Sequence, residues 1–89
     1  MKAIVTVIGK DRVGIIAEVC SLLAANDVNV LDISQTIMQD YFTRIMMVDT
    51  SASAISFTDL AETLKAAGEK SALSIRIMRE DIFNAMHRI

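Results

Sequence analysis

A short polar segment near the start of the chain has the residue types of an anion-binding turn. It reads Gly9-Lys10-Asp11-Arg12-Val13-Gly14-Ile15 and separates an apolar run from an amphipathic stretch. The start of a helix exposes unpaired backbone N–H groups and a positive partial charge, which suit a carboxylate. Gly9 allows a sharp turn, and Gly14 leaves room for a ligand to approach the backbone closely. The segment therefore predicts a cradle for the carboxylate of a small molecule.

Two polar side chains could hold the amino end of the same ligand. Asp11 can either cap the following helix or accept a hydrogen bond from a ligand amine. Asn29 opens the next apolar run and offers both a donor and an acceptor. We expect these groups to converge on one pocket, although a glycine, a capping aspartate and a second glycine are also ordinary turn chemistry. The candidate ligand-binding residues are Gly9, Asp11, Arg12, Gly14, Ile15 and Asn29.

The elements that must position these residues follow from changes in the hydrophobic period. Runs of strand character are expected over residues 3–8, 29–38, 42–49 and 73–78. A first amphipathic helix is expected from an N-cap at Asp11 to a close at Asn26-Asp27, with the asparagine in the left-handed conformation. A second is expected from a cap at Ser56, with Asp59 three residues on, to a stop at Gly68, and a last one opens at Glu80 or Asp81.

The element order predicts an α+β, ferredoxin-like βαββαβ sandwich with an antiparallel sheet in the order 4-1-3-2 and a short extra C-terminal helix. The first and third strands are apolar on both faces, which is typical of central strands, whereas the second and fourth alternate. Both main helices then cover the same sheet face. In the third strand Ile45 and Met47 point to one face and Phe42, Met46 and Val48 to the other. The face that the helices leave open is therefore apolar and needs a cover, which is either the last helix or, in the interpretation we favour, a second copy.

Composition bounds the class of protein. The 89 residues make a single domain, 1–89, with a core of about 1–80 and a C-terminal helix of about 81–89. A net charge of −2 and 4% aromatic residues argue against nucleic acid as a partner. The first apolar run is too short for a membrane span.

The single cysteine, Cys20, fits a reducing compartment, so a cytoplasmic protein is expected. The lone His87 lacks metal-site spacing, and we expect neither metal nor cofactor.

The segment IVTVIGKDRVGIIAEVCSLLAANDVNVLDISQ resembles the opening of an ACT domain, with its strand, D-R-x-G turn, apolar helix and V-N-V strand. DYFTRIMMVD and the tail EDIFNAMHRI are similar to those of short stand-alone ACT proteins of microbes. The resemblance implies a non-enzymatic regulatory homodimer that binds an amino acid or similar effector at an interface and acts on a partner in trans. By position it places Asp11, Gly14 and Asn29 at ligand contacts, whereas Gly9 departs from members with a larger polar residue there.

Two other functions remain open. The ferredoxin-like fold also hosts acylphosphatases, which hold phosphate in the first turn with an arginine, and Arg12 lies roughly there. That chemistry needs an amide side chain to position water, for which Gln35 and Gln39 are weak candidates. The other alternative is a dimerisation or protein-interaction module without a ligand, in which the segment Gly9–Gly14 is only a turn.

Overall fold

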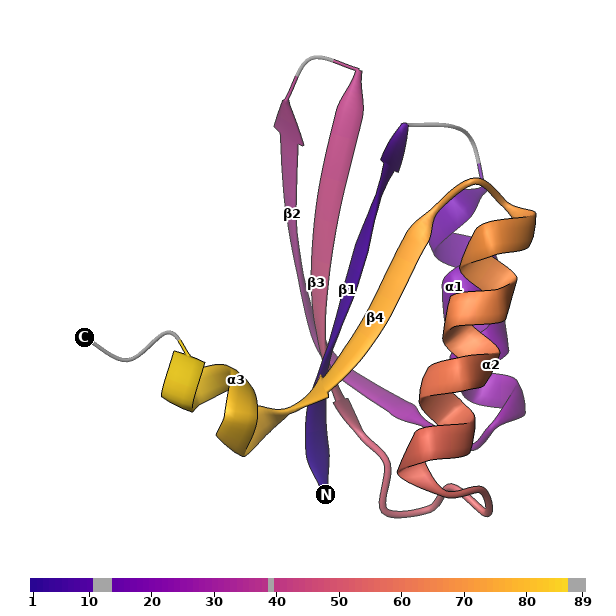
Figure 1. The fold of residues 1–89 in the computed structure, drawn as a ribbon, viewed down its shortest axis with the longest axis vertical. Coiled ribbons are helices and arrows are strands. Elements are labelled where there is room, and N and C mark those ends of the chain that lie inside the picture. Colours follow the sequence, from indigo (N-terminus) through magenta and orange to yellow (C-terminus); the bar gives the residue numbers. More distant parts are fainter. Residues whose placement is uncertain (11–13, 39, 87–89) are drawn as a thin grey trace.

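A computed structural model describes residues 1–10, 14–38 and 40–86 of the chain (Figure 1). Two helices lie together on one side of a four-stranded sheet, and a short third helix lies on the other side (Figure 1). The predicted ferredoxin-like sandwich with an extra C-terminal helix is therefore confirmed. The elements are β1 (Lys2–Lys10), α1 (Ile15–Ala25), β2 (Asn29–Met38), β3 (Tyr41–Asp49), α2 (Phe57–Lys70), β4 (Ser74–Arg79) and α3 (Glu80–Met86).

The sheet is antiparallel throughout, and its strand order is β2-β3-β1-β4, which is the predicted order read from the opposite edge. The register defines its two ends. At one end Gly9 pairs with Phe42, beside the connection between β2 and β3, and we call this the hairpin end. At the other end Asp49 pairs with both Lys2 and Asn29, and we call this the N-terminal end.

The core lies between the helices and one face of the sheet. Alternate residues of β1 and β3 point into it, and Val5, Val7 and Met46 are fully buried there. Removing such aliphatic surface from water contributes about 25 cal/mol per Å², and it is the main force that holds the helices on this face. The helices supply the matching apolar residues, which include Val19, Leu23, Leu60 and Leu64.

The opposite sheet face is only partly covered. Ile4 points to this face yet is 5% exposed, and it lines one hollow together with Phe83 of α3. Further from α3, Ile8 is 44% and Ile45 is 37% exposed. Cover from the chain's own last helix therefore reaches the part of this face next to β4 and leaves apolar side chains open toward the hairpin end.

The first helix begins and ends differently from the prediction. The N-cap residue of α1 is Gly14, at φ 88°, which has no side chain that could cap the helix. The prediction of an N-cap at Asp11 is therefore wrong for α1, and Asp11 itself lies outside the described residues. At the other end Asn26 has φ −104° and Asp27 has φ 58°, so the aspartate rather than the asparagine takes the left-handed conformation.

The second helix starts as predicted but runs further. The Ser56 hydroxyl accepts a hydrogen bond from the Asp59 backbone N–H at 3.1 Å, which confirms the cap. The helix passes Gly68 and ends at Lys70, so the predicted stop at Gly68 is wrong. A Cβ at Gly68 would lie 2.8 Å from the carbonyl oxygen of Leu73, so the glycine permits a close crossing of α2 over β4.

Candidate functional site

Gly14 lies at the hairpin end of the sheet, where the chain passes from β1 to α1 (Figure 1). It is exposed, and no atom of the described residues lies within 4 Å of the position that a Cβ would take. Its positive φ favours glycine whatever the space around it. Ile15 follows as the first residue of α1, so the backbone N–H groups of this terminus start here. The carboxylate cradle at this turn stays a prediction, because Asp11 and Arg12 lie outside the described residues.

Gly9 has a packing reason for its residue type. It is half-buried in β1 on the helix side, and a Cβ at this position would collide with the Cδ2 methyl of Leu73. The structure therefore explains this glycine by the approach of the chain that precedes β4. The prediction that Gly9 contacts a ligand has no independent support from this geometry.

Asn29 lies at the wrong end of the sheet for a pocket formed by one chain. It opens β2 at the N-terminal end and pairs with Asp49, which in turn pairs with Lys2 of β1. Gly9 lies almost the full length of β1 away from Lys2, which at about 3.3 Å per residue is roughly 23 Å. The expectation that Asn29 and the first turn converge within one chain is therefore wrong.

Arg44 is a polar residue that the sequence analysis did not single out. It lies on β3 between Val7 of β1 and Gln35 of β2, on the helix side of the sheet. Its guanidinium carbon is 5.3 Å from the centroid of the Phe42 ring, so the side chain reaches toward the hairpin end. Its Nε is buried and has no hydrogen-bond partner among the described residues. The available signal was a single charge among the alternate positions 42, 44, 46 and 48 of the run FTRIMMVD, where the other three residues are apolar.

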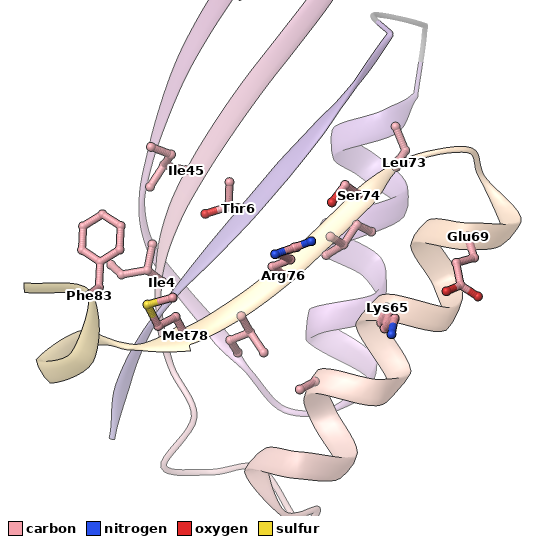
Figure 2. A pocket seen from close by; sticks show the side chains of 13 residues that line it. Ile4, Thr6, Ile45, Lys65, Glu69, Leu73, Ser74, Arg76, Met78 and Phe83 are labelled. Carbon is pink, nitrogen blue, oxygen red and sulfur yellow. The ribbon is translucent and has the colours of Figure 1, made fainter. Parts of the chain in front are cut away.

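One hollow among the described residues, of about 980 Å³, does not involve the predicted residues (Figure 2). It runs over β4, with Thr6, Arg76 and Met78 on one side of the sheet and Lys65 and Glu69 of α2 on the other (Figure 2). A hollow that wraps around an edge strand does not enclose a small molecule. We therefore do not regard it as the effector site.

The described residues hold few groups suited to other chemistry. Among them, no cluster of three or more His, Cys, Asp or Glu side chains is placed to bind a metal ion. None of the helices within the described ranges is both long enough and apolar enough to cross a membrane. Gln35, weighed for an acylphosphatase, lies exposed on β2, and Gln39 lies outside the described residues with Arg12. Hydrogen bonds from the Ser51 side chain and backbone lower the pKa of Asp49.

Comparison with known proteins agrees with the fold and with the sequence resemblance. The chain is 57% identical over 89 residues to a UPF0237 protein of Clostridium acetobutylicum, and the match covers 100% of both chains. An ACT domain protein from Streptococcus pneumoniae superposes with a TM-score of 0.82 at 41% identity, covering 93% of each chain.

A more distant neighbour shows the fold alone. A formyltetrahydrofolate deformylase from Pseudomonas syringae superposes with a TM-score of 0.74 at 22% identity, over 88% of this chain and 27% of that one. The decisive match is to the family model described as the ACT domain, which covers residues 2–78. The chain therefore belongs to the ACT domain family.

Proposed function

We propose that this protein is a cytoplasmic regulatory domain, without catalytic activity, that binds an amino acid or similar small effector at the interface of a homodimer and acts on another protein in trans. The observation that carries the proposal is the separation of Gly14 and Asn29 at opposite ends of one sheet. If both contact one ligand, they must come from two copies of the chain.

The open edge of the sheet supports such a dimer. β2 is an edge strand, and Leu31, Ile33 and Ile37 on it are each more than 40% exposed. A long edge strand with apolar side chains is a template for pairing with another strand. A second copy of the same strand, related by a two-fold axis, is the simplest partner because one patch then serves both subunits.

Antiparallel pairing of two β2 strands would bring the separated groups together. The start of β2 in one copy, Asn29, would lie beside the end of β2 in the other, at the hairpin end where Gly14 is found. With strands spaced by about 4.8 Å, the partner's β2 would be about 14 Å from β1 across β3 and β2. The ligand would lie in the layer above this stretch of sheet, against the start of α1.

Thermal-shift measurements with the twenty amino acids, one at a time, test ligand binding. A compound that binds only the folded dimer raises the melting temperature as its concentration rises. Sedimentation at several protein concentrations tests the dimer in parallel. A dimer whose melting temperature responds to none of the compounds contradicts amino-acid binding.

Mixing two defective variants tests whether the site is shared between subunits. Gly14→Val and Asn29→Ala each remove one half of every site, so each homodimer should lose binding. In a heterodimer of the two variants, one of the two sites retains both native residues. Equal mixing should therefore restore about one quarter of the sites if two chains contribute. Mixed samples that recover no binding, although the separate variants are folded and dimeric, contradict a site built from both chains.

The exposed apolar side chains Ile8 and Ile45 on the open sheet face favour a second candidate, an interaction module that acts without a ligand. Such a module would dimerise or capture a partner through apolar surface alone. A stable dimer that gives no thermal shift with any amino acid would favour it over the effector-binding domain.

A further inference from the structure

We infer that Arg44 is the residue that binds the carboxylate of the effector, and that it does so by swinging off the Phe42 ring on which it rests. The inference rests on the proposed function and adds to it the chemical class of the ligand, a small monocarboxylate with a short apolar side chain. It starts from the Nε of Arg44, which is buried without a hydrogen-bond partner among the described residues.

The resting position of Arg44 leaves donors unused. The guanidinium carbon Cζ lies over the Phe42 ring, 5.3 Å from its centroid, and this cation–π contact provides no acceptor oxygen for the N–H groups. The Nε is buried without an acceptor among the described residues. The ion pairs between described residues join the Met1 amino group to Asp49 and Arg79 to Asp81, and none includes Arg44. The resting conformation is therefore poorly compensated, which lowers the free energy needed to leave it.

The Nε–H and one terminal N–H of arginine lie along one edge and match the two oxygens of a carboxylate. Rotation of Arg44 away from Phe42 would expose the buried Nε–H and present this edge to a ligand. The two hydrogen bonds to the carboxylate would then compensate for the weaker attraction between the guanidinium and the aromatic ring.

The surroundings of Arg44 select the rest of the ligand. Its cross-strand neighbour on the same side of the sheet is Gln35, and Ile33 and Ile37 flank that residue on β2. Both isoleucines are exposed, at 43% and 55%. An apolar side chain attached to the carboxylate could cover them. Arg44 also lies on β3, between the strand that leads to Gly14 and the edge at which the partner's Asn29 would arrive.

The test observes Arg44 directly, by the ¹H–¹⁵N NMR signal of its Nε–H group, with the backbone amides of Gly14 and Asn29 followed in the same spectra. The probes are L-valine, isobutyrate, L-valinamide and inorganic phosphate, each raised to millimolar concentration with the dimer. L-valine and isobutyrate should move the Nε–H proton downfield, because the group then donates a hydrogen bond to a carboxylate. L-valinamide, which lacks the carboxylate, should leave that signal in place.

Variants add an affinity measurement. Arg44→Lys keeps the charge but loses the paired donors, and it should weaken L-valine binding about tenfold or more. Arg44→Gln should weaken it further. The matched control is Arg76→Gln, an exposed arginine on β4, which should change the affinity less than about twofold. Circular dichroism of each variant verifies the fold.

The remaining outcomes distinguish a failure of the role of Arg44 from a failure of the proposed effector site. If the Gly14 and Asn29 amides respond to L-valine while Arg44 and its variants do not, the effector site stands and the role of Arg44 is refuted. If Arg44 responds and those amides do not, the carboxylate site stands and the shared effector site fails. A response to phosphate as large as that to isobutyrate refutes the carboxylate class, and no response to any carboxylate refutes the inference.

Discussion

Substitution of Gly68 by alanine tests the close crossing of α2 over β4. Alanine favours an α-helix over glycine by about 1 kcal/mol, so propensity alone predicts a more stable protein. The new Cβ would lie 2.8 Å from the Leu73 carbonyl oxygen and 3.1 and 3.2 Å from the Cγ1 and backbone N of Ile75. Two of these atoms belong to the backbone of the chain entering β4, so they cannot turn aside as a flexible side chain can.

Overpacking of this kind destabilises by about 1–3 kcal/mol, and contact with backbone places Gly68 in the upper part of that range. After subtraction of the helix-propensity gain, we expect the free energy of unfolding to fall by about 1–2 kcal/mol. In a domain of this size each kcal/mol lowers Tm by about 4–8 °C.

Urea denaturation followed by circular dichroism at fixed protein concentration measures the change, since the stability of a dimer depends on concentration. Ala66→Gly is the matched control, because Ala66 is exposed on the same helix and reports propensity without packing. It should lower stability by about 1 kcal/mol. The decrease for Gly68→Ala equals the cost of overpacking minus the gain in helix propensity, and the decrease for Ala66→Gly measures that propensity. Their sum therefore estimates the cost of overpacking alone. A Gly68→Ala protein more stable than the original would refute the close crossing.

Three further perturbations have expected outcomes. Ser56→Ala removes the α2 cap and should lower the unfolding free energy by about 1 kcal/mol in urea denaturation, with Thr58→Ala as the exposed control; equal effects of the two would contradict the cap. Gly14→Val should destabilise by about 1–2 kcal/mol through its positive φ, and Gly14→Asn by less, whereas equal destabilisation would point to crowding instead. Ser51→Ala should raise the lowered pKa of the Asp49 carboxyl, which NMR titration measures. The lowered carboxyl pKa stabilises the fold at pH values above the ordinary carboxyl pKa, and this contribution disappears as the pH falls. Acid unfolding of the variant should therefore begin at a higher pH. An unchanged titration of Asp49 would contradict the role of Ser51.

The strand order was predictable because both faces of the sheet leave a record in the sequence. β1 and β3 carry apolar residues at consecutive positions, as the central position of each requires. β2 alternates Ile33 and Ile37 with polar residues, as an edge strand does. These patterns depend only on which side chains meet water, so local sequence suffices.

The misassigned features depend on contacts that sequence does not display. Gly68 has the residue type of a helix stop, and only the approach of Leu73 reveals it as a spacer inside α2. Asp11 has the residue type of a cap, yet the left-handed Gly14 precedes the helix. For the candidate site, the turn was correctly placed at the start of a helix, but the position of Asn29 follows from strand direction. Gly14 follows β1 closely along the chain but lies far in space from the opening of β2.

The extra residue in β2 determines where this strand can lose a residue without a change of register. Val30 pairs with Val48 and Asp32 with the next residue of β3, Met47, so Leu31 is an extra residue without a partner in this ladder. An in-frame deletion of Leu31 would leave all the other pairs of this ladder in register, because no partner on β3 would be vacated. The same deletion at Ser34 would move one half of the strand by a residue and turn the one isoleucine of that half to the other face. A variant one residue shorter is thus compatible with this fold at this point of β2.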